Sequence, residues 1–233
     1  MKYSLALLLS LYIFNVQSQE QIPDSLIAYS EPFRSSYHFL SFNDYNPGKG
    51  SITYQNIWLF YNQISYGLTD NITLNGGLII NGDFFWIGGK VGYPIIKDRI
   101  NIGFASRIFV GDGEPVIFNT GQVTFGPRKA NLSVGISFGN RSPRSRLSLK
   151  GMLIIGKRFY FFTENYIDPR EISGEKEVDD LISITGGRIV ADKRGSGFEI
   201  GVIVLPTLPF SDDDDGIATL PFLGITVPLN KRK

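Results

Sequence analysis

Side chains able to carry out chemistry are few in this chain of 233 residues, which has one histidine and no cysteine. His38 is the candidate catalytic residue, because an imidazole beside a serine could act as a base in a hydrolase of membrane lipids. No spacing in the sequence places a serine and an orienting carboxylate beside it. We therefore expect a protein that is not an enzyme, with lipid hydrolysis through His38 as the alternative.

A second candidate is a run of four carboxylates, which could bind calcium or magnesium and so bridge the phosphates of lipopolysaccharide. The run consists of Asp212, Asp213, Asp214 and Asp215. It lacks the spaced oxygen ligands and the glycine of an ordered calcium loop, so we expect a solvated acidic loop instead. A single histidine without cysteine also argues against a transition-metal site. We expect neither a bound metal nor a cofactor.

Six more charges lie within segments that otherwise read as β-strands, and we expect them to face the lumen of a barrel. They are Lys90, Arg107, Lys150, Glu164, Arg188 and Glu199. Arg188 falls on the apolar face of its segment unless Gly186 and Gly187 form a bulge. The charges could pair across the lumen and stabilise the barrel. Alternatively, the excess of cations could line a narrow pore with a mild preference for anions.

The segments themselves show the two-residue period of strands. Every second residue of 132–138 is large and apolar, and the residues between are serine or glycine. Small, polar alternate positions are typical of the lumen of a membrane barrel. The sequence therefore predicts an all-β fold, a single up-and-down antiparallel transmembrane β-barrel of about 12 strands, with 10 as the other count. The first two predicted strands cover 33–42 and 51–68. The reverse arrangement, with apolar residues inside, would give a soluble secreted ligand-binding barrel.

Aromatic residues cluster near the ends of the predicted strands, where ring girdles mark the two membrane interfaces. The predicted girdles include Trp58, Tyr66, Tyr93, residues 84–86 and residues 159–162.

The first residues have the features of an export signal. Lys2 precedes an apolar run from Leu5 to Phe14, and Ser18 ends a stretch suited to signal peptidase. The predicted organisation is a signal peptide over 1–18, a short periplasmic segment over 19–32, an outer-membrane barrel over 33–229 and a basic tail over 230–233.

The connections between predicted strands sort by length and charge. Tight turns and the tail hold 11 basic and 3 acidic residues, whereas the longer loops and the stretch from Asp44 to Lys49 hold 14 acidic and 6 basic residues. The two rims thus carry +8 and −8, although the whole chain carries +1, a balance that argues against a nucleic-acid partner. Short turns and termini of such barrels face the periplasm, so we expect the basic turns there and the acidic loops outside the cell.

Strand and turn sequences carry a resemblance that covers most of the chain after the signal. These are Tyr54-Gln55-Asn56, Thr69-Asp70-Asn71 before Gly76-Gly77, Thr163-Glu164-Asn165 and the closing run from Pro221 to Pro228. The chain resembles small outer-membrane β-barrel proteins of the Bacteroidota type. The resemblance implies a fold and a location, with outer-membrane lipid, lipopolysaccharide and the barrel assembly machinery as partners. It implies no activity, and we expect a narrow channel for an unknown small solute or a structural envelope protein.

Overall fold

The computed structural model describes residues 41–58, 61–79, 84–111, 113–140, 145–155, 158–168, 181–190, 196–205 and 218–229. Two predicted sites, His38 and the run from Asp212 to Asp215, lie outside these residues. In the described part, no helix is long and apolar enough to cross a membrane.

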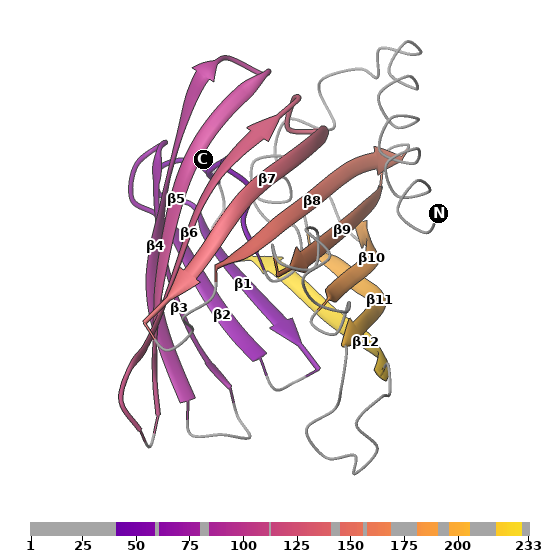
Figure 1. Ribbon diagram of the computed structural model, residues 1–233. Coiled ribbons are helices and arrows are strands. Elements are labelled where there is room, and N and C mark those ends of the chain that lie inside the picture. Colours follow the sequence, from indigo (N-terminus) through magenta and orange to yellow (C-terminus); the bar gives the residue numbers. More distant parts are fainter. Residues whose placement is uncertain are drawn as a thin grey trace.

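Twelve antiparallel strands form one closed barrel (Figure 1). Each strand pairs with the next along the chain, and β1 pairs with β12 to close the ring, so the predicted up-and-down topology is confirmed. The strands are β1 (Ile52–Ile57), β2 (Tyr61–Gly67), β3 (Ile72–Ile79), β4 (Phe84–Ile96), β5 (Ile100–Val110), β6 (Val116–Phe125), β7 (Ala130–Gly139), β8 (Arg146–Ile155), β9 (Phe159–Ile167), β10 (Ile182–Val190), β11 (Gly197–Leu205) and β12 (Ala218–Pro228).

The prediction of one strand over 51–68 was wrong, because this stretch forms both β1 and β2. The chain leaves β1 at Trp58, whose φ of 53° is in the left-handed region. Residues 58–60 are Trp-Leu-Phe and contain none of the Gly, Asn, Asp or Pro that usually mark a turn. The predicted strand over 33–42 lies outside the described residues except for its last two positions. In the described residues, the first strand of the closed barrel begins at Ile52.

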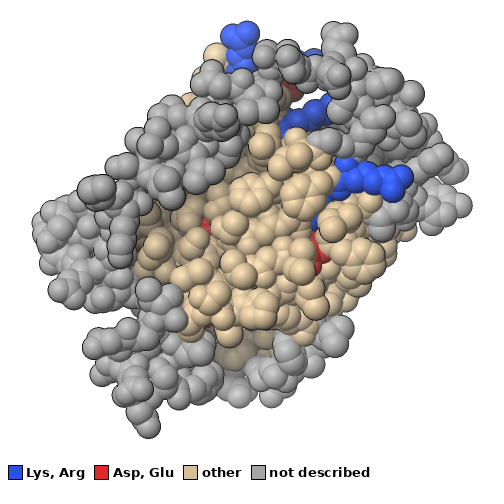
Figure 2. Space-filling view, turned by 90° about the vertical axis from the view of Figure 1, so that its right-hand side faces the viewer, with Lys and Arg blue, Asp and Glu red and all other residues tan. Residues whose placement is uncertain are grey.

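Side chains of the strands alternate between an outer wall and the lumen. On β7, Val134, Ile136 and Phe138 are exposed, whereas Ser133 is fully buried, as the two-residue period predicts. The strands' charged residues are Lys90, Arg107, Arg146, Lys150, Glu164, Arg188 and Glu199, and none of these is exposed. Figure 2 shows one face of the barrel, where the centre of the described surface has very few charged atoms. The described outer wall is thus apolar.

Aromatic rings on the outer wall gather near its two ends. Tyr66, Tyr93 and Phe125 are exposed near one end, and Phe85 and Phe138 are exposed near the other. Trp86, Tyr160 and Phe162 were also predicted to belong to these girdles, but they are buried. They occupy the inward positions of β4 and β9. The girdle prediction used only the clustering of aromatic residues along the sequence, and this clustering does not distinguish rings that face outward from rings that face the lumen.

The connections alternate between the two ends of the barrel, as the antiparallel order requires. We call one end the turn rim; its connections are 68–71, 97–99, 126–129, 156–158 and 191–196. We call the other the loop rim; its connections are 58–60, 80–83, 111–115, 140–145, 168–181 and 206–217. The stretch from Asp44 to Lys49 was predicted on the loop rim. It lies instead inside the barrel and at the turn rim, where the Lys49 amide donates to Asp70 Oδ1 at 3.0 Å.

Closure of the ring predicts a specific cross-link in this cysteine-free chain. Tyr54 and Val227 are directly opposed across β1 and β12, and opposed outward residues are within reach of a disulfide after small adjustments. We expect Tyr54→Cys with Val227→Cys to form an intramolecular disulfide on oxidation, visible as a reducible shift on denaturing gels. The control pair, Tyr54→Cys with Leu223→Cys, places the second thiol on the same face but out of register. Equal cross-linking of both pairs would contradict this closure.

Candidate functional site

The inner face of the barrel carries all six charges that the sequence analysis assigned to it. Lys90, Lys150, Glu164, Arg188 and Glu199 are buried, and Arg107 is half-buried. The structure brings them together in two groups. Arg188 and Glu199 lie beside the seam between β1 and β12, and the other four lie around the segment that precedes β1.

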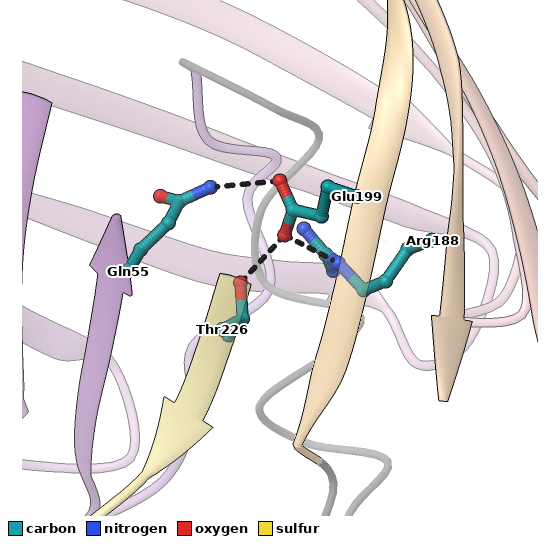
Figure 3. Close-up of polar contacts among 4 residues, drawn as sticks. All are labelled: Gln55, Arg188, Glu199 and Thr226. Carbon is teal, nitrogen blue, oxygen red and sulfur yellow. Dashed lines mark hydrogen bonds and ion pairs between the residues drawn. The ribbon is translucent and has the colours of Figure 1, made fainter. Parts of the chain in front are cut away.

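At the seam, the Glu199 carboxylate collects hydrogen bonds from three neighbouring strands (Figure 3). Arg188 Nε on β10 donates to Oε1 at 2.8 Å, and Thr226 Oγ1 on β12 donates to the same oxygen at 2.5 Å. Gln55 Nε2 on β1 donates to Oε2 at 3.2 Å. All four side chains are buried. One carboxylate on β11 therefore links the first strand to the last three.

Arg188 reaches this position without a bulge. The pairing of β10 with β11 runs without interruption through Gly186 and Gly187, and Arg188 is directly opposite Glu199. Ile184 and Val190 share its face of β10 and are buried too. The bulge was inferred from the assumption that apolar positions face outward, and that assumption fails on this strand.

Residues 42–47, which we call the luminal segment, are buried inside the barrel. Lys90 Nζ on β4 donates to the carbonyl oxygens of Asn43 at 3.2 Å and of Tyr45 at 2.5 Å. Two strands along the ring, Gln122 Nε2 on β6 donates to the Phe42 carbonyl at 3.0 Å. Within the segment, the Tyr45 amide donates to Asn43 Oδ1 at 3.1 Å. The wall supplies partners for other backbone groups of the segment, as buried main chain requires.

Asp44 connects the luminal segment to β6. Its carboxylate accepts hydrogen bonds from Gln122 Nε2 at 2.9 Å and from Thr124 Oγ1 at 2.7 Å. Burial raises the pKa of this carboxyl, which lies outside the strands; the two hydrogen bonds and the charges of Lys90 and Lys150 oppose that rise. The carboxylate is thus held by neutral donors as well as by cations.

Two glycines make room for Asp44. Gly92 on β4 and Gly103 on β5 are directly opposed. A Cβ on Gly92 would collide with the Asp44 carbonyl oxygen, and a Cβ on Gly103 would collide with its carboxylate. The pair forms a notch in the wall that the luminal segment fills.

The luminal segment is also anchored at the turn rim. Tyr45 Oη donates to the Gly126 carbonyl at 2.5 Å, and Arg128 donates to the Asn46 carbonyl at 3.0 Å. These contacts fix the end of the segment that leads into β1.

Lys150 and Glu164 are opposed on β8 and β9 and lie deeper in the lumen. Lys150 Nζ donates to Gln122 Oε1 at 2.6 Å. Glu164 accepts hydrogen bonds from the Ser41 amide at 3.3 Å and from Tyr166 Oη at 3.0 Å. Both side chains therefore contact protein groups inside the barrel.

Toward the loop rim the inner face becomes apolar. Ile57, Phe162, Ile184, Ile203 and Phe222 pack into one buried cluster. Tyr61 packs against this cluster and begins a row of rings. The row continues through Trp86, Phe109 and Phe118, with centroid distances of 5.8 to 6.0 Å between successive rings. A second buried apolar cluster, formed by Met152, Tyr160 and Val190, lies on the inner face near the turn rim. The expectation of a polar lumen thus holds only for part of the inner face.

Sequence reasoning missed the luminal segment. Its residues, Phe-Asn-Asp-Tyr-Asn-Pro, lack the two-residue period of a strand and contain turn-forming types, which argued for a loop. A signal for the segment was available in the strands that contact it. Gly92 and Gly103 leave gaps on inward faces, and a gap in a barrel wall needs something to fill it.

These features define the class of protein: a closed twelve-strand up-and-down β-barrel with a segment of its own chain inside. A scan against protein-family models gave no match, and no curated protein matched the chain significantly. Among the described residues, no group of three or more acidic, histidine or cysteine side chains could hold a metal ion.

The seam predicts a strong effect of Glu199→Gln. The substitution leaves the buried Arg188 guanidinium without its carboxylate, which typically costs about 3 to 5 kcal/mol. We expect a lower urea midpoint for unfolding in detergent micelles. Lys97→Gln, an exposed change at the turn rim, should leave the midpoint unchanged.

The double variant Glu199→Gln with Arg188→Met tests whether the unpaired Arg188 charge causes the loss of stability. It removes both charges and keeps much of the buried volume. It should recover a large part of the lost stability. If Glu199→Gln is no less stable than the parent protein, the seam does not depend on this carboxylate.

Proposed function

We propose that the protein is an integral barrel of the bacterial outer membrane whose lumen is closed by the luminal segment. The observation that carries this proposal is the outer wall, on which no charged residue of the described strands is exposed. A lysine or arginine facing lipid near the midplane costs about 2 to 4 kcal/mol, so a membrane barrel excludes them there.

The size and shape of the wall support the same location. Ile87, Phe198 and Leu223 point outward and are 57%, 62% and 62% exposed. A soluble barrel would gain nothing from such exposure and would aggregate. Strands β4 to β12 contain 9 to 13 residues, and a tilted strand of about 10 residues crosses an apolar band of about 25 Å. The outward rings near both ends would then lie at the two membrane interfaces.

Orientation follows from the connections. Short turns of such barrels face the periplasm and longer loops face outward, so we place the turn rim in the periplasm. The luminal segment would then close the periplasmic half of the lumen. The alternative of a lipid hydrolase has no support from the described residues, since His38 lies outside them.

Closure by the luminal segment argues for a channel that conducts only when this segment moves, and against a permanently open pore. Lys90, Gln122 and the notch at Gly92 and Gly103 all contact the segment. A small solute could pass the turn-rim half only after these contacts break. The lumen charges therefore serve first to hold the closed state.

Spin labels can test the membrane location, because the chain has no native cysteine. We expect a label at Val134→Cys, on the outer wall, to collide with oxygen far more than with a water-soluble nickel complex in reconstituted vesicles. A label at Glu114→Cys, exposed at the loop rim, should show the opposite preference. If the nickel complex reaches Val134 as easily as Glu114, the barrel is soluble.

Closure can be tested with Gly103→Val. The added side chain overlaps Asp44, and overpacking of this kind typically costs about 1 to 3 kcal/mol. We expect the open population, measured as ion conductance in planar bilayers, to rise about tenfold to a hundredfold. Gly121→Val is the matched control, because a Cβ there meets no neighbouring atom within 4 Å. Equal conductance of the two variants would contradict closure by this segment.

A further inference from the structure

The turn rim carries an excess of positive charge that the closure of the lumen does not explain. Among its described residues the acidic side chains are Asp70 and Asp98. The basic side chains are Lys49, Lys97, Arg99, Arg128, Lys129 and Arg158, so the net charge of this end is +4. The described connections of the loop rim contain Glu114 and Asp168 and no lysine or arginine. The positive charge therefore belongs to one end of the barrel.

Three of these cations point into solvent rather than into the protein. Arg128 donates to the luminal segment and Lys129 is half-buried, whereas Lys97, Arg99 and Arg158 are exposed. Within the described residues, none of these three forms an ion pair. Their charges are thus available to a partner outside the chain.

The main chain beneath these cations is fixed. The Arg99 amide donates to the Ile96 carbonyl at 3.0 Å, and the Arg99 carbonyl accepts from the Gly126 amide at 2.8 Å. The Arg158 carbonyl accepts from the Val190 amide at 2.8 Å. Figure 1 shows the turns between β4 and β5 and between β6 and β7 at the upper end of the barrel. The cations therefore project from a rim whose backbone is already ordered.

The same connections begin where the apolar outer wall ends. Ile96, directly before Lys97, is 47% exposed, and Ile155, three residues before Arg158, is 52% exposed. Phe125 is exposed directly before the connection 126–129. A long basic side chain at such an edge keeps its aliphatic part on apolar surface and its charge at the level of lipid phosphates.

We propose that Lys97, Arg99 and Arg158 bind the phosphate groups of anionic phospholipids in the leaflet that surrounds the turn rim. This inference rests on the proposed membrane location and adds the class of lipid that the barrel selects. Charge complementarity carries it, because basic residues beside a bilayer attract anionic headgroups. A zwitterionic lipid offers the same phosphate but brings a positive group with it. An acidic periplasmic protein would not require cations directly beside exposed apolar residues.

Electron paramagnetic resonance of spin-labelled lipids tests this selectivity, with the full-length protein in vesicles of phosphatidylcholine. Lipid in contact with a barrel gives a motionally restricted component, and its size is compared for labelled phosphatidylglycerol and labelled phosphatidylcholine. Each cation near the bilayer strengthens the attraction of an anionic lipid about fivefold, and averaging over all lipids around the wall leaves a preference of about twofold. We expect that preference for phosphatidylglycerol at low salt and its decline at high salt.

Variants assign the preference to the three cations. The triple variant Lys97→Gln, Arg99→Gln, Arg158→Gln should bind both lipids equally. The matched control, Lys97→Arg, Arg99→Lys, Arg158→Lys, conserves each charge and should keep the preference. All three positions are exposed and lie outside the strands, so both variants should fold, which heat-modifiable gel migration checks.

The outcomes separate this inference from the membrane location. Absence of a restricted component for either lipid would overturn the membrane location and this inference with it. A restricted component of equal size for both lipids would overturn this inference alone. A preference that survives the triple glutamine variant would overturn the assignment to these residues. Loss of the preference when inorganic phosphate replaces chloride at constant ionic strength would show that the rim binds free phosphate, which would also overturn it.

Discussion

The barrel depends on the closure of β1 against β12. Only five residue pairs join these strands, from Thr53 with Pro228 to Ile57 with Gly224. Glu199 reinforces this short seam from the inside, because its carboxylate connects β10, β12 and β1 through buried side chains. A closed ring has no free strand edge, and its lumen has a fixed width. The distances between side chains that meet across the lumen are therefore set by the closure of the ring.

A lumen of fixed width has to be filled, and different parts of it are filled by different groups. Beside the turn rim, a piece of main chain enters, and main chain needs hydrogen-bonding partners, which Lys90, Gln122 and Thr124 provide. Toward the loop rim, rings and branched aliphatic residues such as Phe222 and Ile184 meet one another directly. Polar and apolar filling meet at Phe42, which stacks on Arg107 and forms the boundary between them.

Sequence periodicity was sufficient for the fold class and for the strands from β3 to β12, because alternation on strands such as β7 is strict. It did not separate β1 from β2, and it placed the stretch from Asp44 to Lys49 at the wrong rim. It was insufficient where an inward position is apolar. Trp86, Phe162 and Arg188 each occupy the lumen, and in each case the rule that apolar residues face lipid gave a wrong or an ambiguous answer. The turn at Trp58 carried no turn-forming residue, and the luminal segment carried no period at all. Both arise from contacts between distant parts of the chain, which local patterns do not record.

The luminal segment is joined to the first strand of the wall by residues 48–51, and this short tether has a kinetic consequence. The Gly50 amide donates to the Gly67 carbonyl at 2.7 Å, so the tether is itself fastened to the rim. A segment that leaves the notch at Gly92 and Gly103 cannot diffuse away, and short tethers keep such a group at an effective concentration on the order of millimolar. Rebinding is then intramolecular and fast. In the channel proposed above, the luminal segment should therefore return to the notch spontaneously after each opening.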